Sequence, residues 1–322
     1  MFTRLLLNAV ISLSLLTGCV RGTELRSAAG APEPDEALAG IDIVATLDVD
    51  GRPRSYRLHV PAGLDPSAPS ALVVALHGGG GNGANMQVKI GLDAVADRES
   101  FLVANPDGSG RLDGYLLTWN AGNCCGYALD ERVDDTAFLR AMVEAISRTH
   151  SIDPRRVYAT GMSNGGMMAY RLACEAADLF AAVAPVAGAL NLEPCEPSER
   201  VSVLAIHGTA DQHVLFEGGA PAITVDSHSR VDHSVHHAVT FWAARNGCAL
   251  QATQTHAGSV IHDVYPGCEA GSAVELIAIE GGGHAWPGAV KFSPQGDEPS
   301  QAVNASEAIW AFFEAHPKTQ GG

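Results

Sequence analysis

The segment Val157-Tyr158-Ala159-Thr160-Gly161-Met162-Ser163-Asn164-Gly165-Gly166-Met167 decides the fold class of this chain. An apolar strand pattern comes first, then Gly-Met-Ser-Asn-Gly, then the start of a helical pattern. This order predicts a sharp strand-to-helix turn that carries the Ser163 hydroxyl above a sheet. The flanking glycines allow strand and helix to approach closely, and the helix N-terminus favours negative charge beside the serine. The alternative, a glycine turn without chemistry, does not explain the strand and helix patterns around it.

Strand and helix patterns alternate on both sides of this segment. Three short apolar runs, 71–76, 157–160 and 201–206, are followed by turns that contain glycine, as buried parallel strands are. Helical patterns lie at 133–150, 167–176 and 302–316. The alternation predicts one α/β domain, with a mostly parallel central sheet and helices on both faces.

The folded domain is expected to span 41–316. Alternating apolar residues at 41–48 and 55–60 flank a turn at Asp50-Gly51, which predicts an antiparallel hairpin at the start of the domain. Residues 20–40, rich in Ala, Gly, Pro and Glu, are predicted to form a flexible tether, and 317–322 a short tail.

Residues 1–19 have the features of an export signal. Arg4 precedes the apolar run Leu5 to Leu16, which is short for a membrane span. The following Thr17-Gly18-Cys19 resembles the end of a lipobox, in which Cys19 is lipidated and becomes the new N-terminus. An ordinary cleaved signal is the alternative. The protein is therefore expected to be exported, and either lipid-anchored at the cell surface or outer membrane, or secreted.

The composition excludes nucleic acid as a partner. The net charge is −16 and the 20 Lys and Arg residues form no cluster, whereas a phosphate-binding face needs one. The acidic residues are spread along the chain, which indicates a solvated surface. We expect contact with a membrane only through the N-terminal lipid.

Six cysteines remain after Cys19, and an even number in an exported chain predicts three disulfides. Cys248 and Cys268 bracket a short polar segment and form the simplest pair, which would stabilise the fold by about 3 kcal/mol. Cys124 and Cys125 are each expected to reach Cys174 or Cys195, in an order that the sequence leaves open. The sequence contains no CxxC pair, so the spacing of the cysteines does not favour a zinc site.

A serine hydroxyl needs a base, and the base needs an acid that holds it in the right tautomer. Asp211 follows the 201–206 run within His207-Gly208-Thr209-Ala210-Asp211, and His284 ends Glu280-Gly281-Gly282-Gly283-His284 after another apolar run. The order Ser163, Asp211, His284 predicts a catalytic triad at the carboxyl edge of the sheet. Asp263 and Asp226 are rival acids, but neither directly follows an apolar strand.

Two backbone donors are needed for the oxyanion of such a reaction. The amide of Asn164 is one candidate, and Gly79 in Leu76-His77-Gly78-Gly79-Gly80-Gly81 is the other. A phosphate-binding loop is the alternative for these glycines, but no GK[ST] follows. We expect no cofactor.

Two further groups of residues lie in sequence near this machinery. Trp119 and Trp286 are candidates for the wall of a substrate pocket, or for core packing. His228, His233, His236 and His237 invite a metal assignment, but without a HExxH arrangement we expect a solvated helix start and no metal.

With these residues in view, the chain resembles the esterase family that joins polyhydroxybutyrate depolymerases with feruloyl and acetylxylan esterases, known as carbohydrate esterase family one. The resemblance covers about 41–316. It is carried by Thr118-Trp119-Asn120 with Cys124-Cys125-Gly126, Val133-Asp134-Asp135, Arg156 to Tyr170, and Gly282-Gly283-His284-Ala285-Trp286-Pro287-Gly288.

The resemblance implies an α/β-hydrolase fold, the triad Ser163, Asp211 and His284, and an oxyanion hole of Gly79 and Asn164. Many family depolymerases have His-Gly-Cys where this chain has His77-Gly78-Gly79, and we expect no polymer-binding domain because no Thr-rich linker is visible. The sequence therefore predicts a serine esterase acting on feruloyl or acetyl esters of plant polysaccharide, or on hydroxyalkanoate esters. An acyltransferase with the same triad and a non-catalytic binding lipoprotein are the alternatives.

Overall fold

The computed structural model describes residues 40–224 and 229–319. The predicted signal with Cys19, and the predicted tether up to residue 39, lie outside these ranges. Within them, no helix is long and apolar enough to cross a membrane.

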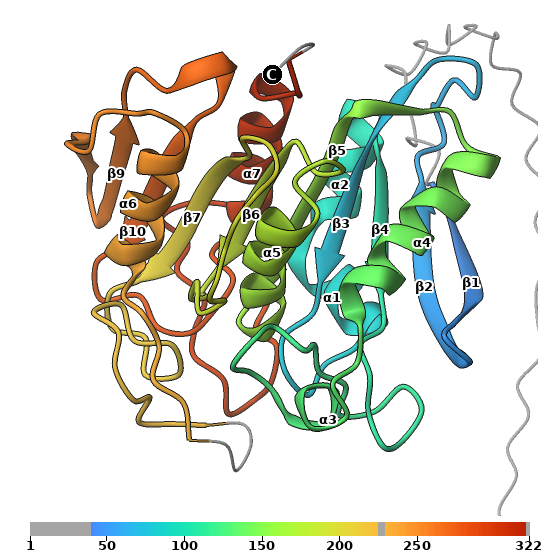
Figure 1. Ribbon diagram of the computed structural model, residues 1–322, viewed down its shortest axis with the longest axis horizontal. Helices are drawn as coiled ribbons and strands as arrows, with labels where there is room; N and C mark the ends of the chain where they lie inside the picture. Colours follow the sequence, from blue (N-terminus) through green and yellow to red (C-terminus); the bar gives the residue numbers. More distant parts are fainter. Residues whose placement is uncertain (1–39, 225–228, 320–322) are drawn as a thin grey trace, which may run out of the picture. The chain divides into compact units, whose positions relative to one another are not determined.

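Ten strands form one twisted sheet (Figure 1). They are β1 (Ile41–Val49), β2 (Arg52–Val60), β3 (Ser70–Leu76), β4 (Leu102–Pro106), β5 (Ile152–Met162), β6 (Ala182–Val186), β7 (Ser202–Gly208), β8 (Thr253–Ala257), β9 (Val260–Tyr265) and β10 (Val274–Ile279). Their order is β1-β2-β4-β3-β5-β6-β7-β10-β9-β8. The six central strands, from β4 to β10, run parallel, and an antiparallel hairpin closes each edge.

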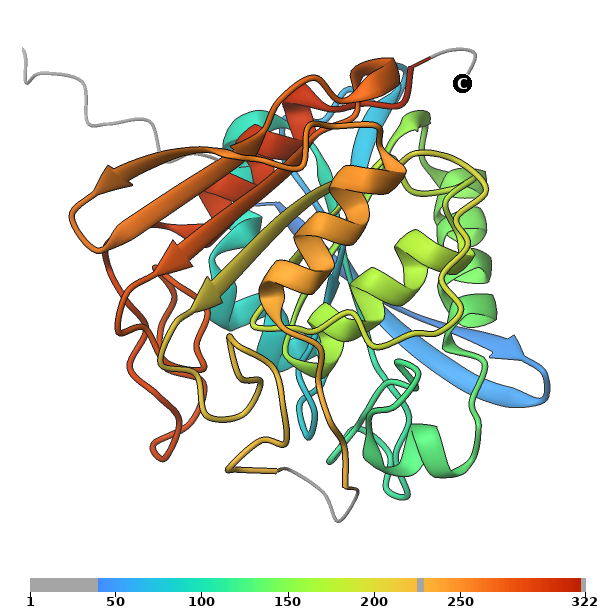
Figure 2. The same cartoon turned by 60° about the vertical axis from the view of Figure 1, so that its left-hand side comes forward.

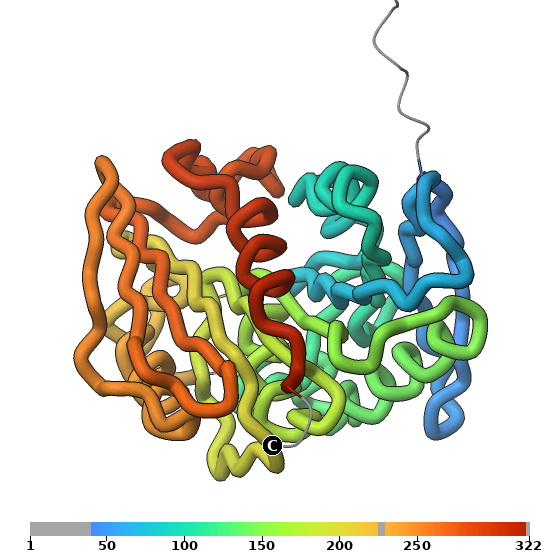
Figure 3. Tube along the Cα trace, turned by 90° about the horizontal axis from the view of Figure 1, so that it is seen from above, coloured from blue at the N-terminus to red at the C-terminus, as the bar shows by residue number. Residues whose placement is uncertain are grey.

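Helices cover both faces of the sheet. They are α1 (Gly83–Ile90), α2 (Leu92–Glu99), α3 (Gly126–Asp130), α4 (Asp135–Thr149), α5 (Asn164–Glu175), α6 (Val235–Arg245), α7 (Ala305–Ala315) and the 3₁₀ turn η1 (Glu269–Gly271). In Figure 3, α1, α2 and α7 project from one side of the sheet, and α4, α5 and α6 lie on the other. Figure 2 shows α5 and α6 over the same face.

Two apolar layers fill the space between sheet and helices. Met142 of α4, Leu172 of α5 and Trp242 of α6 belong to one layer. Met86 of α1 and Phe313 of α7 belong to the other. Strands covered on both faces must be apolar throughout, which is why β3, β6 and β7 are buried along their whole length. The predicted fold class is therefore confirmed.

The sequence did not predict the hairpin of β8 and β9 at the far edge. All five residues of β8 are exposed, so this strand lacks the apolar alternation that reveals a half-buried strand. The predicted tail also differs in part. Lys318 donates hydrogen bonds from Nζ to the carbonyl oxygens of Ala177 and Asp178 and pairs with Glu199, so the chain packs on the fold as far as Thr319.

The disulfides confirm one predicted pair and correct the rest. Cys248 is bonded to Cys268, as predicted, and the bond joins the end of α6 to the end of the β8–β9 hairpin. Cys124 is bonded to its neighbour Cys125, and Cys174 to Cys195. The prediction that Cys124 and Cys125 each reach Cys174 or Cys195 was wrong, because each of these pairs closes within its own part of the fold.

Candidate active site

Ser163 stands between the end of β5 and the start of α5. Its backbone has φ 58° and ψ −121°, a conformation that non-glycine residues rarely adopt. The Ser163 amide donates to the Val186 carbonyl at 2.8 Å, which ties the turn to β6. A Cβ at Gly165 would lie 2.5 Å from the His77 carbonyl oxygen, so only glycine fits beside the turn. This is the local geometry expected of a nucleophile elbow.

Asp211 lies on the loop after β7 and is buried. Its Oδ1 accepts hydrogen bonds from the backbone amides of His213 (2.8 Å) and Val214 (2.9 Å). Its Oδ2 faces the ring of His284 at 2.7 Å and that of His207 at 3.4 Å. Burial alone raises the pKa of a carboxyl, but the hydrogen bonds from His207 and His284 hold the pKa of Asp211 well below its usual range. Asp211 is therefore ionised at neutral pH.

His284 lies on the glycine-rich loop after β10, with its side chain 12% exposed. Because Nδ1 is bonded to ionised Asp211, it carries the ring proton and leaves Nε2 with a lone pair. The backbone amide of His284 donates to the carboxylate of Asp297 at 2.6 Å, which fixes the loop. Within 40–224 and 229–319, no hydrogen bond joins the Ser163 hydroxyl to His284. The structure thus brings Asp211 and His284 together, and Ser163 stands at the same edge of the sheet.

The glycine loop after β3 is held in place by a buried histidine. His77 Nε2 accepts from the Gly108 amide at 2.9 Å, so Nδ1 carries the proton and donates to the Gly78 carbonyl at 2.8 Å. Burial lowers the pKa of His77 to about 4, which keeps this ring neutral. A Cβ at Gly78 would lie 3.5 Å from Cβ of Ser163, so the loop passes close to the serine.

The backbone amides of Gly79 and Asn164 belong to the two segments that meet at Ser163, the glycine loop after β3 and the start of α5. In the described part of the chain, neither donates to another backbone group, whereas the next amide, Gly80, donates to Leu117 at 2.8 Å. The Asn164 side chain has a different task, because it exchanges two hydrogen bonds with the backbone of Trp119, at 2.7 and 2.9 Å.

Trp119 and Trp286 do not form the wall of a substrate pocket. Both side chains are 0% exposed. The Trp119 indole donates to the His77 carbonyl at 2.9 Å and so supports the glycine loop from below. The Trp286 indole donates to the Ser306 hydroxyl at 3.2 Å and packs in the layer under α7. The alternative of core packing is therefore correct for both.

A narrow cleft opens at Ser163. It is lined by Cys124, Cys125, Ser163, Met167, His213, Ile223 and Arg230. Most of this lining is apolar, and the exceptions are Ser163, the His213 ring and the Arg230 side chain.

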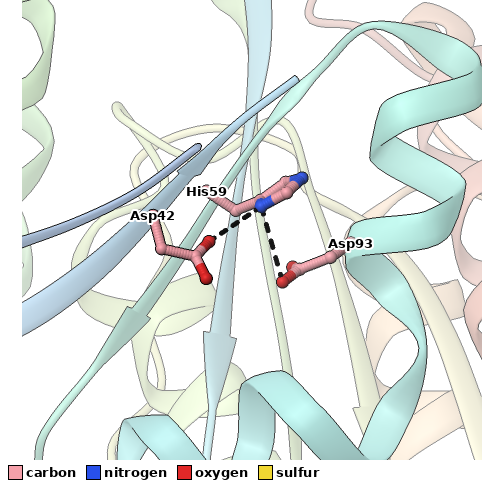
Figure 4. A group of neighbouring side chains, drawn as sticks. All are labelled: Asp42, His59 and Asp93. Atoms are coloured by element: carbon pink, nitrogen blue, oxygen red, sulfur yellow. Dashed lines mark hydrogen bonds and ion pairs between the residues drawn. The ribbon is translucent and has the colours of Figure 1, made fainter. Parts of the chain in front are cut away.

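Histidines and carboxylates that could bind a metal meet elsewhere, at the N-terminal hairpin. Asp42, His59 and Asp93 bring ligand-type atoms within 4.8 Å of one another (Figure 4). His59 Nδ1 lies 2.9 Å from Asp42 and Nε2 lies 3.1 Å from Asp97, so a protonated ring satisfies these carboxylates by itself. The cluster joins β1 and β2 to α2.

The histidine run at the start of α6 forms a different arrangement. The rings of His233 and His237 stack with centroids 4.1 Å apart, and His233 pairs with Glu193 at 3.1 Å. Burial and the neighbouring His233 lower the pKa of His237. His228 and the rival acid Asp226 lie outside the described residues. The other rival acid, Asp263, accepts a hydrogen bond from Gln254 on β8.

Several residues of the site carried no signal in the sequence. Asp297 holds the His284 loop from a segment without regular structure. His213 stacks on His284, with ring centroids 4.6 Å apart. His213 lies two residues after Asp211, and Asp297 lies thirteen residues after His284. Neither spacing belongs to a general motif. His77 did lie within a predicted motif, the glycine loop 76–81. Its tautomer, however, depends on a contact with Gly108 that the sequence does not reveal.

Comparisons with known proteins agree with this geometry. The model of the family described as esterase PHB depolymerase matches residues 54–237, more than half of the chain. The chain is 35% identical over 259 residues to the NocK protein of Nocardia uniformis subsp. tsuyamanensis, covering 74% of this chain and 72% of NocK. It is 32% identical over 275 residues to feruloyl esterase C of Emericella nidulans, covering 81% of this chain and 84% of the relative.

Solved structures show the same fold. The acetyl xylan esterase from Aspergillus awamori superimposes with a TM-score of 0.58 at 15% identity, over 85% of this chain and 99% of that one. The chain belongs to the esterase PHB depolymerase family, with an α/β-hydrolase fold, and is a carboxylic ester hydrolase.

Proposed function

We propose that this protein is a serine esterase that hydrolyses carboxylic esters through an acyl-enzyme. The observation that carries the proposal is the Ser163 backbone, held at φ 58° in a turn where only glycines fit beside it. Such strain is retained where a side chain must be presented in one direction. Here the direction is toward a cleft at the edge that also carries the Asp211–His284 pair.

In the proposed acylation, Ser163 Oγ attacks the ester carbonyl carbon while His284 Nε2 takes the hydroxyl proton. Ionised Asp211 stabilises the resulting imidazolium and keeps the proton of Nδ1 in place. The negative charge on the carbonyl oxygen is received by the amides of Gly79 and Asn164. His284 then gives its proton to the leaving alcohol as the ester bond breaks.

In the proposed deacylation, a water molecule takes the place of the alcohol. His284 removes a proton from the water, the hydroxide attacks the acyl carbon, and Ser163 leaves with the proton that His284 returns. Every proton is thus supplied and recovered by one histidine, and the scheme uses no cofactor.

The candidate substrates are feruloyl or acetyl esters of plant polysaccharide and hydroxyalkanoate esters. The relative from Emericella nidulans is named a feruloyl esterase and the structural neighbour an acetyl xylan esterase, which supports the first class. Export, with lipidation at Cys19 as an anchor, remains part of the proposal, since it agrees with polymeric substrates that stay outside the cell.

The test compares the full chain in detergent with its Ser163→Ala variant on p-nitrophenyl butyrate and methyl ferulate. Loss of the nucleophile should lower turnover on the order of 10⁶-fold. A fluorophosphonate should label the wild-type protein and leave the variant unlabelled. Ser67→Ala serves as the control, because Ser67 lies in an exposed turn and bonds with Asp65.

Equal turnover in the wild-type protein and Ser163→Ala would disprove the acyl-enzyme. A labelled Ser163 without release of acid in water, but with transfer of the acyl group to an added alcohol, would identify an acyltransferase. Absence of both labelling and turnover in folded protein would support the binding lipoprotein.

A further inference from the structure

His213 is a second histidine at the proposed reaction centre. It lies two residues after Asp211 and lines the same cleft as Ser163. Its ring stacks on that of His284, with centroids 4.6 Å apart and an interplanar angle of 30°. The proposed triad does not require His213, because Asp211 already orients His284 through Nδ1.

The backbone of His213 is fixed from two sides. Its amide donates to Asp211 Oδ1 at 2.8 Å, and its carbonyl accepts from Nη2 of Arg230 at 2.5 Å. Arg230 is in turn bonded through Nε to Asp232 at 2.9 Å, and both side chains are buried, at 5% and 0% exposure. A buried ion pair of this kind holds its geometry firmly. The His213 ring is therefore presented to the cleft from a rigid support.

The ring itself still has hydrogen-bonding capacity. His213 Nδ1 is buried and has no hydrogen-bond partner within residues 40–224 and 229–319. A buried polar atom without a partner is destabilising, so such an atom beside a reaction centre calls for an explanation. Burial and the neighbouring His284 lower the pKa of His213, so its ring is neutral at pH 7 and can both donate and accept.

The place of His213 indicates which half of an ester it meets. In the proposed mechanism His284 returns its proton to the oxygen of the leaving alcohol, so the alcohol must lie beside the His284 ring. A ring that stacks on His284 and also lines the cleft is next to the alcohol half. The apolar lining, Met167 and Ile223, is then left for the acyl half.

We propose that His213 contacts the alcohol half of the substrate and favours alcohols that carry further hydroxyl groups, as the sugar units of carbohydrate esters do. A sugar hydroxyl both donates and accepts, and so does a neutral imidazole. The alcohol half of a hydroxyalkanoate dimer carries only a carboxylate, which accepts but cannot donate. This inference rests on the proposed function and selects the polysaccharide esters among its candidate substrates.

The experiment uses two esters of one acid, methyl ferulate and feruloyl arabinose, so that contacts of the acyl half cancel. The measured quantity is the ratio of kcat/KM for the sugar ester to kcat/KM for the methyl ester. His213→Phe keeps an aromatic ring against His284 but removes both nitrogens, and should lower this ratio about tenfold. His213→Asn keeps a polar group near Nδ1 and should retain most of the ratio. His256→Phe on exposed β8 is the control.

The outcomes separate this inference from the function on which it rests. If His213→Phe slows both esters equally, His213 acts only by supporting His284, and the inference is wrong. If the wild-type protein prefers a hydroxybutyrate dimer and His213→Phe removes that preference, the sugar assignment is overturned. If Ser163→Ala leaves the turnover of methyl ferulate unchanged, the proposed function itself fails. Melting temperatures show whether each variant folds, and His213→Asn provides the test should His213→Phe unfold.

Discussion

Two histidines of this molecule face aspartates through Nδ1 in nearly the same way. They differ in the partner of the second ring nitrogen, Nε2. At the carboxyl edge of the sheet, Nδ1 of His284 lies 2.7 Å from Asp211, and among the described residues Nε2 has no hydrogen-bond partner. At the N-terminal hairpin, Nδ1 of His59 lies 2.9 Å from Asp42, but Nε2 also meets a carboxylate, Asp97, at 3.1 Å.

The difference teaches that a histidine–aspartate pair becomes a base only when the second nitrogen is left open. His59 is bound at both ends and surrounded by three carboxylates. Burial alone lowers the pKa of a histidine, but Asp42, Asp93 and Asp97 raise the pKa of His59 above its usual value. The His59 ring thus joins β1 and β2 to α2 through carboxylates at both of its nitrogens, whereas Nε2 of His284 has no hydrogen-bond partner among the described residues.

The largest effect should come from removing the charge of the acid at the carboxyl edge. In Asp211→Asn the amide can no longer fix the His284 tautomer or stabilise the imidazolium, so kcat should fall about 10⁴-fold. Ester turnover in the variant measures this. Asp263→Asn, a change on β9 away from His284, should leave kcat within about twofold. Equal losses in both variants would contradict the assignment of the acid.

A smaller effect should come from loosening the loop without touching the pair. Asp297→Ala removes the acceptor of the His284 amide, which contributes about 1.5 kcal/mol as a charged hydrogen bond, so kcat should fall about tenfold with KM little changed. Steady-state kinetics check this. Glu298→Ala is the matched control, because its carboxylate is 82% exposed and pairs with Lys291 at the surface. Unchanged kcat in Asp297→Ala would show that the pair alone holds the ring.

The smallest effect should be on stability, at the other histidine. Because the folded-state pKa of His59 lies above its ordinary value of 6.5, its stabilisation is complete below that pH and is lost as pH rises through the raised pKa. His59→Asn should lower the melting temperature by about 2–4 °C at pH 6, with a smaller loss at pH 9, and leave kcat unchanged. Thermal unfolding at both pH values checks this, with His256→Asn as control. A larger loss at pH 9 would mean that His59 is neutral in the fold.

Sequence was sufficient where the chemistry is local. The turn at Ser163 needs glycines within two residues, and an apolar strand followed by a helical pattern can be identified directly from the residues. The alternation of such patterns was enough for the fold class. Asp211 and His284 could be named because carboxyl ends of parallel strands share one edge, which brings loops 73 residues apart together.

Sequence was not sufficient where the partner is set by packing across the fold. Cys124 is bonded to its direct neighbour Cys125, a pairing that the spacing of the cysteines does not single out. The burial of Trp119 depends on a hydrogen bond to the His77 carbonyl from a segment 42 residues away. Asp297 and His213 act through backbone atoms and ring faces, to which no motif corresponds.

All four tryptophans of the chain, Trp119, Trp242, Trp286 and Trp310, lie in its interior, with at most 4% of any side chain exposed. The indole fluorescence of the native protein should therefore be emitted at short wavelength and resist quenching by iodide. Trp119 supports the glycine loop through its bond to the His77 carbonyl, and Trp286 lies in the core two residues beyond His284. Loosening of either region would redden the emission before the rest of the protein unfolds, which gives the esterase an intrinsic optical reporter of its own active-site integrity.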